Sequence, residues 1–302
     1  MPLIRANGID IHVETQGDAA ATPMVLVRGL GSQIIHWPAA MIDRFVAGGF
    51  FVVTADNRDA GLSQKFDAWG TIDAQDMQRR LDAGEPLDVP YGVDDLAADD
   101  QFAVMDHFGI ERAHVMGISM GGMIVQVMAA RRPERLHSMT TVMSSSGNPE
   151  FPLGSSPDVR ALLLAQPDNP EDRDSVIAFT LRCDRVWGSP GYPFDEAERA
   201  DLIGRAFDRC WTPEGVRRQF AAVRSSGSRV DLLKTITVPR LVIHGLDDCL
   251  AQSEHGRDTA RNIPGAALVE IPGMGHDLEG DLGPMIANHV MRHARHAEAP
   301  TG

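Results

Sequence analysis

The segment Gly117-Ile118-Ser119-Met120-Gly121-Gly122 constrains this chain more than any other part of its sequence. It joins an apolar run typical of a buried strand, residues 113–116, to an apolar run with helical character, residues 123–130. A serine between glycines at such a junction can occupy a tight, strained turn that exposes its hydroxyl and directs the following N–H toward a ligand. Because glycines and serines also cluster in ordinary turns, the prediction of a nucleophile elbow at Ser119 depends on the rest of the chain.

Short apolar runs alternate with helical stretches over most of the sequence. Strands are predicted over 3–15 (bent at residues 7–8), 24–28, 50–55, 113–116, 138–143, 240–244 and 267–271. Helices are predicted over 38–47, 93–108, 123–130 and 282–293, with a long polar connection over 64–91 and a disordered tail from Ala294. Strands separated by helices form βαβ units, so we expect an α/β fold with a mostly parallel central sheet and helices on both faces.

Residues 144–233 interrupt this alternation. They show no strong strand signal, are rich in Pro and Asp, and contain helical stretches over 159–165, 172–182 and 195–207. We therefore interpret residues 1–143 and 234–302 as a core domain and residues 144–233 as a helical cap, or lid, inserted over the carboxyl edge of the sheet. The aromatic side chains of the insertion either line a substrate pocket or form a small core of their own, and for any single one the second interpretation is favoured.

Composition argues against several classes of protein. The formal net charge of -14 makes nucleic acid an unsuitable partner, because phosphate binding relies on clustered Lys and Arg. No apolar run approaches the roughly 18 residues of a membrane span, and residues 1–8 lack the features of a secretory signal, so we expect a cytoplasmic protein. The three cysteines and eleven histidines are too scattered for a disulfide framework or a zinc site, so no metal is expected.

Three loops that follow predicted strands carry residues suited to nucleophilic catalysis. They contain Ser119, Asp248 and His276, in that order along the chain, and ligands bind parallel sheets of this kind at the carboxyl ends of the strands. A serine hydroxyl is a poor nucleophile near neutral pH, so it needs a histidine to accept its proton. A buried carboxylate then fixes the tautomer of that histidine and stabilises its protonated form. We predict that these three residues form a catalytic triad.

Two other carboxylates compete with Asp248 for this role. Asp247 lies one residue closer to the strand and is the main alternative, whereas Asp277 would normally point away from the ring of its neighbour His276. The alternative for His276 itself is a loop histidine satisfied by backbone carbonyls. The glycines close to it in a loop at a strand end favour the catalytic interpretation.

Attack on a carbonyl creates an oxyanion, which requires preorganised N–H donors. Each donor contributes on the order of 3 kcal/mol. We expect the backbone N–H groups of Met120, which follows the serine, and of Leu30, which lies in the turn Gly29-Leu30-Gly31-Ser32 after the second predicted strand region. The alternative for this turn is a plain tight connection.

Four segments together resemble the α/β-hydrolase fold enzymes and, among them, the aclacinomycin methylesterase-like esterases. They are Gly29-Leu30-Gly31-Ser32, Asp56-Asn57-Arg58-Asp59-Ala60-Gly61-Leu62-Ser63, Pro90-Tyr91-Gly92-Val93-Asp94-Asp95 and Gly117-Ile118-Ser119-Met120-Gly121-Gly122. The resemblance covers nearly the whole chain. It implies a serine carboxylic-ester hydrolase that uses no cofactor, with Ser119, Asp248 and His276 matching the triad.

The implied partner is a small-molecule ester or lactone. The aromatic and methionine content near the elbow and in the insertion suggests that this substrate is apolar, and a homo-oligomer is left open. The same triad would also serve acyl transfer, perhydrolysis or C–C bond hydrolysis, and some members of this fold are non-catalytic receptors. The intact Ser, His and Asp disfavour a receptor.

Two positions depart from the family pattern. Arg28 stands where relatives often have histidine, and its guanidinium could contact a substrate carboxylate, pair with an acid or extend into solvent; a structural role is favoured. Cys249 stands where many relatives have proline after the triad acid, which bears on the geometry of that loop.

Within the segment 56–63, Arg58 and Asp59 are expected to bond to the backbone near the elbow.

Overall fold

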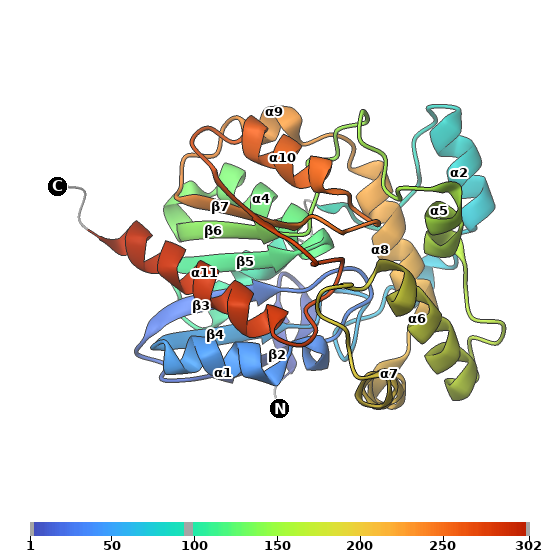
Figure 1. Ribbon diagram of the computed structural model, residues 1–302, viewed down its shortest axis with the longest axis horizontal. Coiled ribbons are helices and arrows are strands. Elements are labelled where there is room, and N and C mark those ends of the chain that lie inside the picture. The colour runs from blue at the N-terminus through green and yellow to red at the C-terminus, as the bar shows by residue number, and fades with distance from the viewer. Residues whose placement is uncertain (1–2, 94–98, 300–302) are drawn as a thin grey trace.

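A computed structural model describes residues 3–93 and 99–299 of the chain, which surround an eight-stranded sheet (Figure 1). The strand order is β1-β2-β4-β3-β5-β6-β7-β8. The strands are β1 (Leu3–Ala6), β2 (Ile9–Gln16), β3 (Thr22–Val27), β4 (Phe50–Ala55), β5 (Ala113–Ile118), β6 (Leu136–Val142), β7 (Arg240–Gly245) and β8 (Ala267–Ile271). Among the described strands, only β1 with β2 and β2 with β4 pair antiparallel, so the predicted mostly parallel sheet is confirmed.

Helices cover both faces of this sheet, as predicted. The helices are α1 (Ala39–Ala47), α2 (Ala74–Asp82), α3 (Phe102–His107), α4 (Met120–Arg131), α5 (Pro157–Leu164), α6 (Arg173–Trp187), α7 (Glu196–Cys210), α8 (Pro213–Ser225), α9 (Val230–Leu233), α10 (Ser253–Asn262) and α11 (Leu282–Glu298). On one face, Phe45 of α1 and Ile286 of α11 share a core with the β3 residue Leu26. On the other face, Ile124 of α4 packs in a core with Val25 and Val115. Coverage of both faces explains why β4 and β5 are buried at every residue.

The chain between β6 and β7 forms five helices, α5–α9, and no strand in residues 144–233, all of which are described. In Figure 1, α5–α8 gather on the right, beyond the ends of the central strands. Helix α8 was not predicted from the sequence. Its buried face includes Arg218 and Gln219, so apolar periodicity does not reveal it.

The structure changes three other expectations. The connection over 64–91 contains α2, whose first turn is capped by the carboxylate of Asp73, and a further unpredicted helix, α10, follows β7. The helix predicted over 93–108 lies partly outside the described residues, which include α3 at its end.

The expected disordered tail from Ala294 is wrong. Helix α11 continues to Glu298 because Ala294 is fully buried and the Glu298 carboxylate lies 3.1 Å from Nε2 of His114.

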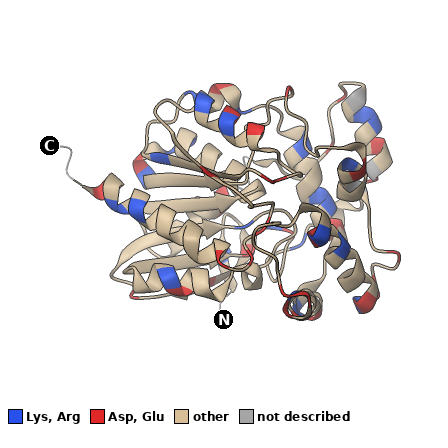
Figure 2. Cartoon of the chain, viewed as in Figure 1, with Lys and Arg blue, Asp and Glu red and all other residues tan. Residues whose placement is uncertain are grey.

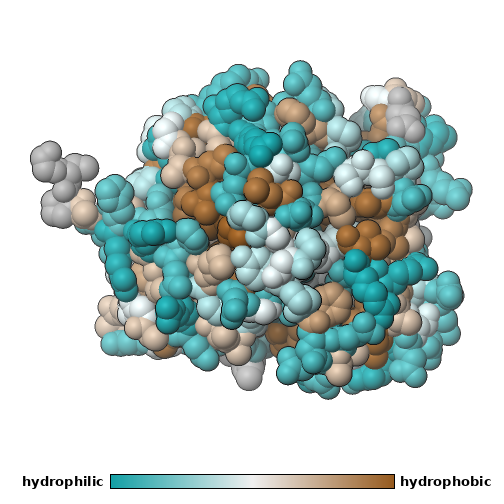
Figure 3. Space-filling model, viewed as in Figure 1, coloured by the Kyte–Doolittle hydropathy of each residue, from teal (hydrophilic) through white to brown (hydrophobic). Residues whose placement is uncertain are grey.

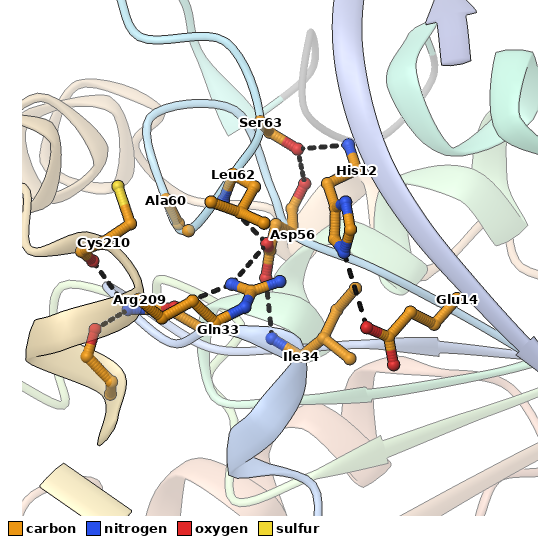
Figure 4. Close-up of polar contacts among 12 residues, drawn as sticks. His12, Glu14, Gln33, Ile34, Asp56, Ala60, Leu62, Ser63, Arg209 and Cys210 are labelled. Atoms are coloured by element: carbon orange, nitrogen blue, oxygen red, sulfur yellow. Dashed lines mark hydrogen bonds and ion pairs between the residues drawn. The ribbon is translucent and has the colours of Figure 1, made fainter. Parts of the chain in front are cut away.

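Two buried aspartates after β4 hold α7 and α8 against the core. Arg209 of α7 donates to the carboxylate of Asp56 over 2.8 Å, and Figure 4 shows this contact beside the backbone N–H donors of the same carboxylate. Arg218 of α8 donates through Nε and Nη2 to Asp59 over 2.9 and 2.8 Å, with both side chains almost completely buried. The Asp59 carboxylate also accepts a backbone bond from Phe66, in part as predicted.

Arg58 has a structural role as expected, although its partner is a side chain. Its guanidinium donates through Nε and Nη2 to the buried carboxylate of Asp100 over 2.7 and 2.6 Å. The carbonyl of Arg58 accepts a hydrogen bond from Gln219 of α8, so the segment after β4 contacts α8 through backbone and side chain alike.

Surface charge is mixed in sign. In Figure 2, acidic and basic residues are interspersed on helices and loops while the strands are mostly uncharged. Figure 3 shows apolar residues near the centre of this view and among the helices on its right. Within residues 3–93 and 99–299, no helix has the length and apolar character needed to cross a membrane.

We expect the substitution Arg218→Met to lower the free energy of unfolding by roughly 3–5 kcal/mol, because it leaves the buried carboxylate of Asp59 without its cation. Denaturant unfolding followed by circular dichroism measures this loss. Arg205→Met is the matched control, since Arg205 pairs with Asp201 on an exposed face of α7 and should change stability by no more than about 0.5 kcal/mol. If both substitutions lower the free energy of unfolding equally, the buried pair of Arg218 and Asp59 contributes no more to stability than an exposed one, contrary to this prediction.

Candidate active site

Ser119 occupies a strained turn between β5 and α4. Its backbone has φ 53° and ψ −121°, a conformation that non-glycine residues rarely adopt. The turn is held in place because the Ser119 N–H donates to the carbonyl of Val142 over 2.9 Å, and the Ser119 carbonyl accepts from Gly122 over the same distance. A strained residue that its surroundings fix so firmly is typical of a functional site.

The glycines around Ser119 are required by close packing. A Cβ atom at Gly117 would overlap the carbonyl of Gly121, and one at Gly121 would overlap the carbonyl of Val27 in β3. A Cβ atom at Gly122 would collide with Ser144 after β6. These glycines therefore let β3, β5 and β6 approach the start of α4 closely.

The structure brings together the three residues predicted to form the triad. Nε2 of His276 lies 3.0 Å from Oγ of Ser119, and Nδ1 lies 2.7 Å from Oδ2 of Asp248. The other carboxylate oxygen of Asp248 accepts backbone bonds from Leu250 and Ala251 over 2.9 and 2.8 Å. These bonds fix the buried carboxylate so that one oxygen faces the imidazole. The geometry permits proton transfer from the serine to the histidine.

The charge of Asp248 controls the protonation of His276. Burial by itself would lower the pKa of His276, but the negative charge of Asp248 and its hydrogen bond raise this pKa above the ordinary value of 6.5. An imidazole with such a pKa accepts a proton readily and can return it near neutral pH.

The two competing carboxylates have other partners. Asp247 is exposed, and its Oδ2 accepts the N–H of Gly273 over 2.7 Å. Asp277 accepts the N–H and the hydroxyl of Ser189, each over 2.7 Å. Of the three aspartates, Asp248 is the one whose carboxylate hydrogen-bonds the ring of His276.

Residues of the 144–233 segment support the two loops that carry Asp248 and His276. The N–H of His276 donates to the carbonyl of Trp187 over 2.7 Å, at the end of α6. The thiol of Cys249 contacts the carbonyl of Val186 over 3.3 Å, and the carbonyl of Cys249 accepts from Ser155 over 2.8 Å. Cys249 in place of proline is therefore accommodated by contacts with this segment.

The predicted N–H donors for an oxyanion lie close to Ser119. Met120 is the first residue of α4, where N–H groups have no partner within the helix. Leu30 lies in a turn closed by a hydrogen bond from Ser32 to Gly29 over 3.3 Å. A Cβ atom built at Gly29 would lie 3.1 Å from Cβ of Ser119, so the turn packs directly on the serine. Both donor residues line the same cavity as Ser119.

This cavity has a volume of about 410 Å³ and lies between the sheet and helices α5–α8. Much of its lining is apolar and comes from the 144–233 segment, with Phe179, Phe207, Val216 and Phe220 as examples. The polar residues of the wall include Arg28, Ser32, His36, Asp184, Arg199, Asp277 and Glu279. Among the described residues, no group of three or more His, Cys, Asp or Glu side chains is arranged to hold a metal ion.

The sequence singled out Arg28 as a departure from the family pattern, with a structural role favoured, and gave no indication of His36, Arg199 or Glu279. Glu279 could have been found from its position three residues after His276 in the same loop. Arg199 offers no such signal, because it comes from α7, far along the chain from Arg28.

The chain is similar to known hydrolases over nearly its full length. The model of a family described as alpha/beta hydrolase fold matches residues 22–173. Rhodomycin D methylesterase DnrP from Streptomyces peucetius is 29% identical, and the alignment covers 98% of each protein.

Two solved structures have the same fold. The enol-lactonase from Burkholderia xenovorans LB400 superposes with a TM-score of 0.72 at 22% identity, covering 97% of this chain and 100% of that one. The meta-cleavage product hydrolase from Pseudomonas fluorescens IP01 superposes with a TM-score of 0.73 at 18% identity, covering 98% of this chain and 97% of that one. At these identities the likeness concerns the fold alone.

We expect Asp248→Asn to lower turnover of an activated ester roughly ten-thousand-fold, because the amide cannot hold the required tautomer of His276. The acid limb of the pH profile of the remaining activity should shift to lower pH than in the wild type. Burial lowers the pKa of His276, and in the variant the carboxylate of Asp248 no longer opposes this effect. The measurement is the pH profile of kcat/KM. Asp247→Asn is the matched control, and a larger loss in that variant would show that the acid is assigned to the wrong residue.

Proposed function

Because this chain belongs to the alpha/beta hydrolase fold family, we propose that it hydrolyses carboxylic esters or lactones through an acyl-enzyme formed on Ser119. The observation that carries the proposal is the continuous hydrogen-bonded path from Oγ of Ser119 through His276 to Asp248 at the wall of a cavity. Such a path activates a serine for attack on a carbonyl.

In the proposed reaction, Oγ of Ser119 attacks the substrate carbonyl while Nε2 of His276 takes the hydroxyl proton. The N–H groups of Leu30 and Met120 stabilise the oxyanion of the tetrahedral intermediate. His276 then gives its proton to the leaving alkoxide, and the acyl group stays on Ser119. A water molecule, deprotonated by His276, attacks the acyl-enzyme. The bond between the acyl carbon and Oγ of Ser119 then breaks, His276 returns the proton to Oγ, and the carboxylic acid is released.

The 144–233 segment acts in this proposal as a cap that determines which substrates enter. Its side chains supply much of the apolar lining of the cavity, which favours substrates with an apolar body. The name of the relative DnrP, a methylesterase, supports cleavage of an ester, and that of 3-oxoadipate enol-lactonase 2 from Acinetobacter baylyi, a relative at 23% identity, supports a lactone.

We expect Ser119→Ala to lower turnover by up to about a million-fold without loss of the folded state. The assay uses p-nitrophenyl esters of graded chain length, lactones and bulky methyl esters, with the wild type run beside the variant. Circular dichroism and thermal unfolding establish that the variant is folded.

Substantial activity in folded Ser119→Ala would exclude this mechanism. Product analysis in the presence of a competing alcohol or peroxide separates hydrolysis from transfer. If the wild type forms product only when such an acceptor is present, simple hydrolysis is the wrong reaction.

A further inference from the structure

Arg28 lies at the end of β3, two residues before the proposed oxyanion donor Leu30, and lines the same cavity as Ser119. Its guanidinium carbon lies 4.8 Å from the ring centre of the buried Trp37. This stacking fixes the plane of the guanidinium and leaves its hydrogen-bonding edge available to other groups.

The guanidinium has almost no hydrogen-bonding partners. Nε and Nη1 of Arg28 are buried and have no partner within residues 3–93 and 99–299, and Nη2 has only a 3.5 Å contact with the hydroxyl of Ser32. Burial and the neighbouring charge of Arg199 lower the pKa of Arg28 to about 9, so the group still carries a full charge at pH 7. A buried, charged donor without an acceptor is unfavourable unless a ligand supplies one.

Two carboxylates of this wall, Asp184 and Glu279, are already engaged by Arg199, and a third, Asp277, accepts from Ser189. Nε and Nη2 of Arg199 donate to Asp184 over 2.7 and 3.3 Å, and Nη1 donates to Glu279 over 3.2 Å. Burial and the charges of Arg28 and Arg199 lower the pKa of His36 to about 3, so this neighbour is neutral and adds no further positive charge. Arg28 is thus the cation of this wall that has no direct ion pair among the described residues.

We propose that Arg28 binds a carboxylate of the substrate, so that the substrate is an ester or lactone that also carries a free carboxylate group. This inference rests on the proposed function and specifies the substrate class of the same site. A planar carboxylate matches the fork of a guanidinium in shape and charge. Glu279 and Asp277 also lie on this wall, and their carboxylates repel a dianionic phosphate more strongly than a singly charged carboxylate. A carboxylate is therefore the favoured anion.

The inference also assigns different parts of the substrate to different parts of the cavity. The carboxylate lies against Arg28 and Ser32, with Trp37 behind the guanidinium, and the remainder lies against the apolar residues of α6–α8. The net charge of -14 does not attract anions to the protein as a whole, so a preference for an anionic substrate would have to come from the cavity.

The test compares wild-type kcat/KM for mono-p-nitrophenyl esters of glutaric, adipic and suberic acid with that for the same compounds whose free carboxyl is capped as a methyl ester. A second pair, 4-acetoxybutyrate and its methyl ester, places the carboxylate on the alcohol side. We expect the carboxylate form to be preferred by about 10- to 100-fold in at least one pair, as for a charge-assisted hydrogen bond. This comparison requires no variant and stands even if substitutions at Arg28 disturb folding.

Arg28→Met should abolish that preference by lowering kcat/KM for the carboxylate form about 10- to 100-fold more than for the capped form. Arg217→Met is the matched control, because Arg217 is similarly half-buried but pairs with Glu214 and does not line the cavity. It should leave the preference of the wild type intact.

Equal rates on free and capped forms in every pair would overturn this inference alone, provided that the capped esters are hydrolysed in a Ser119-dependent manner. A preference that persists in folded Arg28→Met would overturn it as well. If the wild type hydrolyses none of these pairs but does hydrolyse other esters or lactones of the wider panel, the inference alone is overturned. Failure on the whole panel would overturn the proposed function together with the inference.

Discussion

The close approach of backbones around Ser119 is the constraint on which the rest of the site depends. Gly117, Gly121 and Gly122 have no room for a Cβ atom, because β3, β6 and the start of α4 contact them directly. This contact holds Ser119 at a positive φ that its own side chain disfavours, and the strain is compensated by packing on all sides. The same contact places the turn after β3 against the serine, so the proposed nucleophile and both proposed oxyanion donors are positioned by one packed junction.

The shape of the cavity depends on a second set of interactions, which are ionic and lie in the interior. Asp56 and Asp59 follow β4 directly and bind Arg209 of α7 and Arg218 of α8. Gln33 contributes from the core side by donating to two carbonyls at the end of α7, each over 2.7 Å. Because buried charges tolerate little displacement without loss of their partners, these contacts hold the helices over the cavity in a defined orientation. The elbow and the helices above it are therefore both fixed relative to the sheet.

The sequence was most informative where structure follows from apolar periodicity or from fixed spacing. The parallel sheet and the fold family were predicted correctly, since buried parallel strands are continuous apolar runs and the glycine-rich turns follow them directly. Helices α8 and α10 were missed because their buried faces include polar residues such as Arg218 and Asp258, whose partners lie far away in sequence. The environment of Arg28 was unpredictable for the same reason: it depends on Arg199, which α7 brings into the cavity wall only in the folded chain.

The position of Arg28 close to the oxyanion turn also bears on the chemistry of an anionic substrate. Two negative charges would then exist in one cavity during the reaction, the carboxylate of the substrate and the oxyanion that forms at its carbonyl. In a partly buried site these charges repel each other strongly, which would raise the energy of the transition state. A guanidinium bound to the carboxylate offsets this repulsion before attack begins, and it does so without competing with the N–H groups of Leu30 and Met120 for the oxyanion. In the proposed reaction the cation directly follows β3, so one short segment, residues 28–30, would neutralise one charge and stabilise the other.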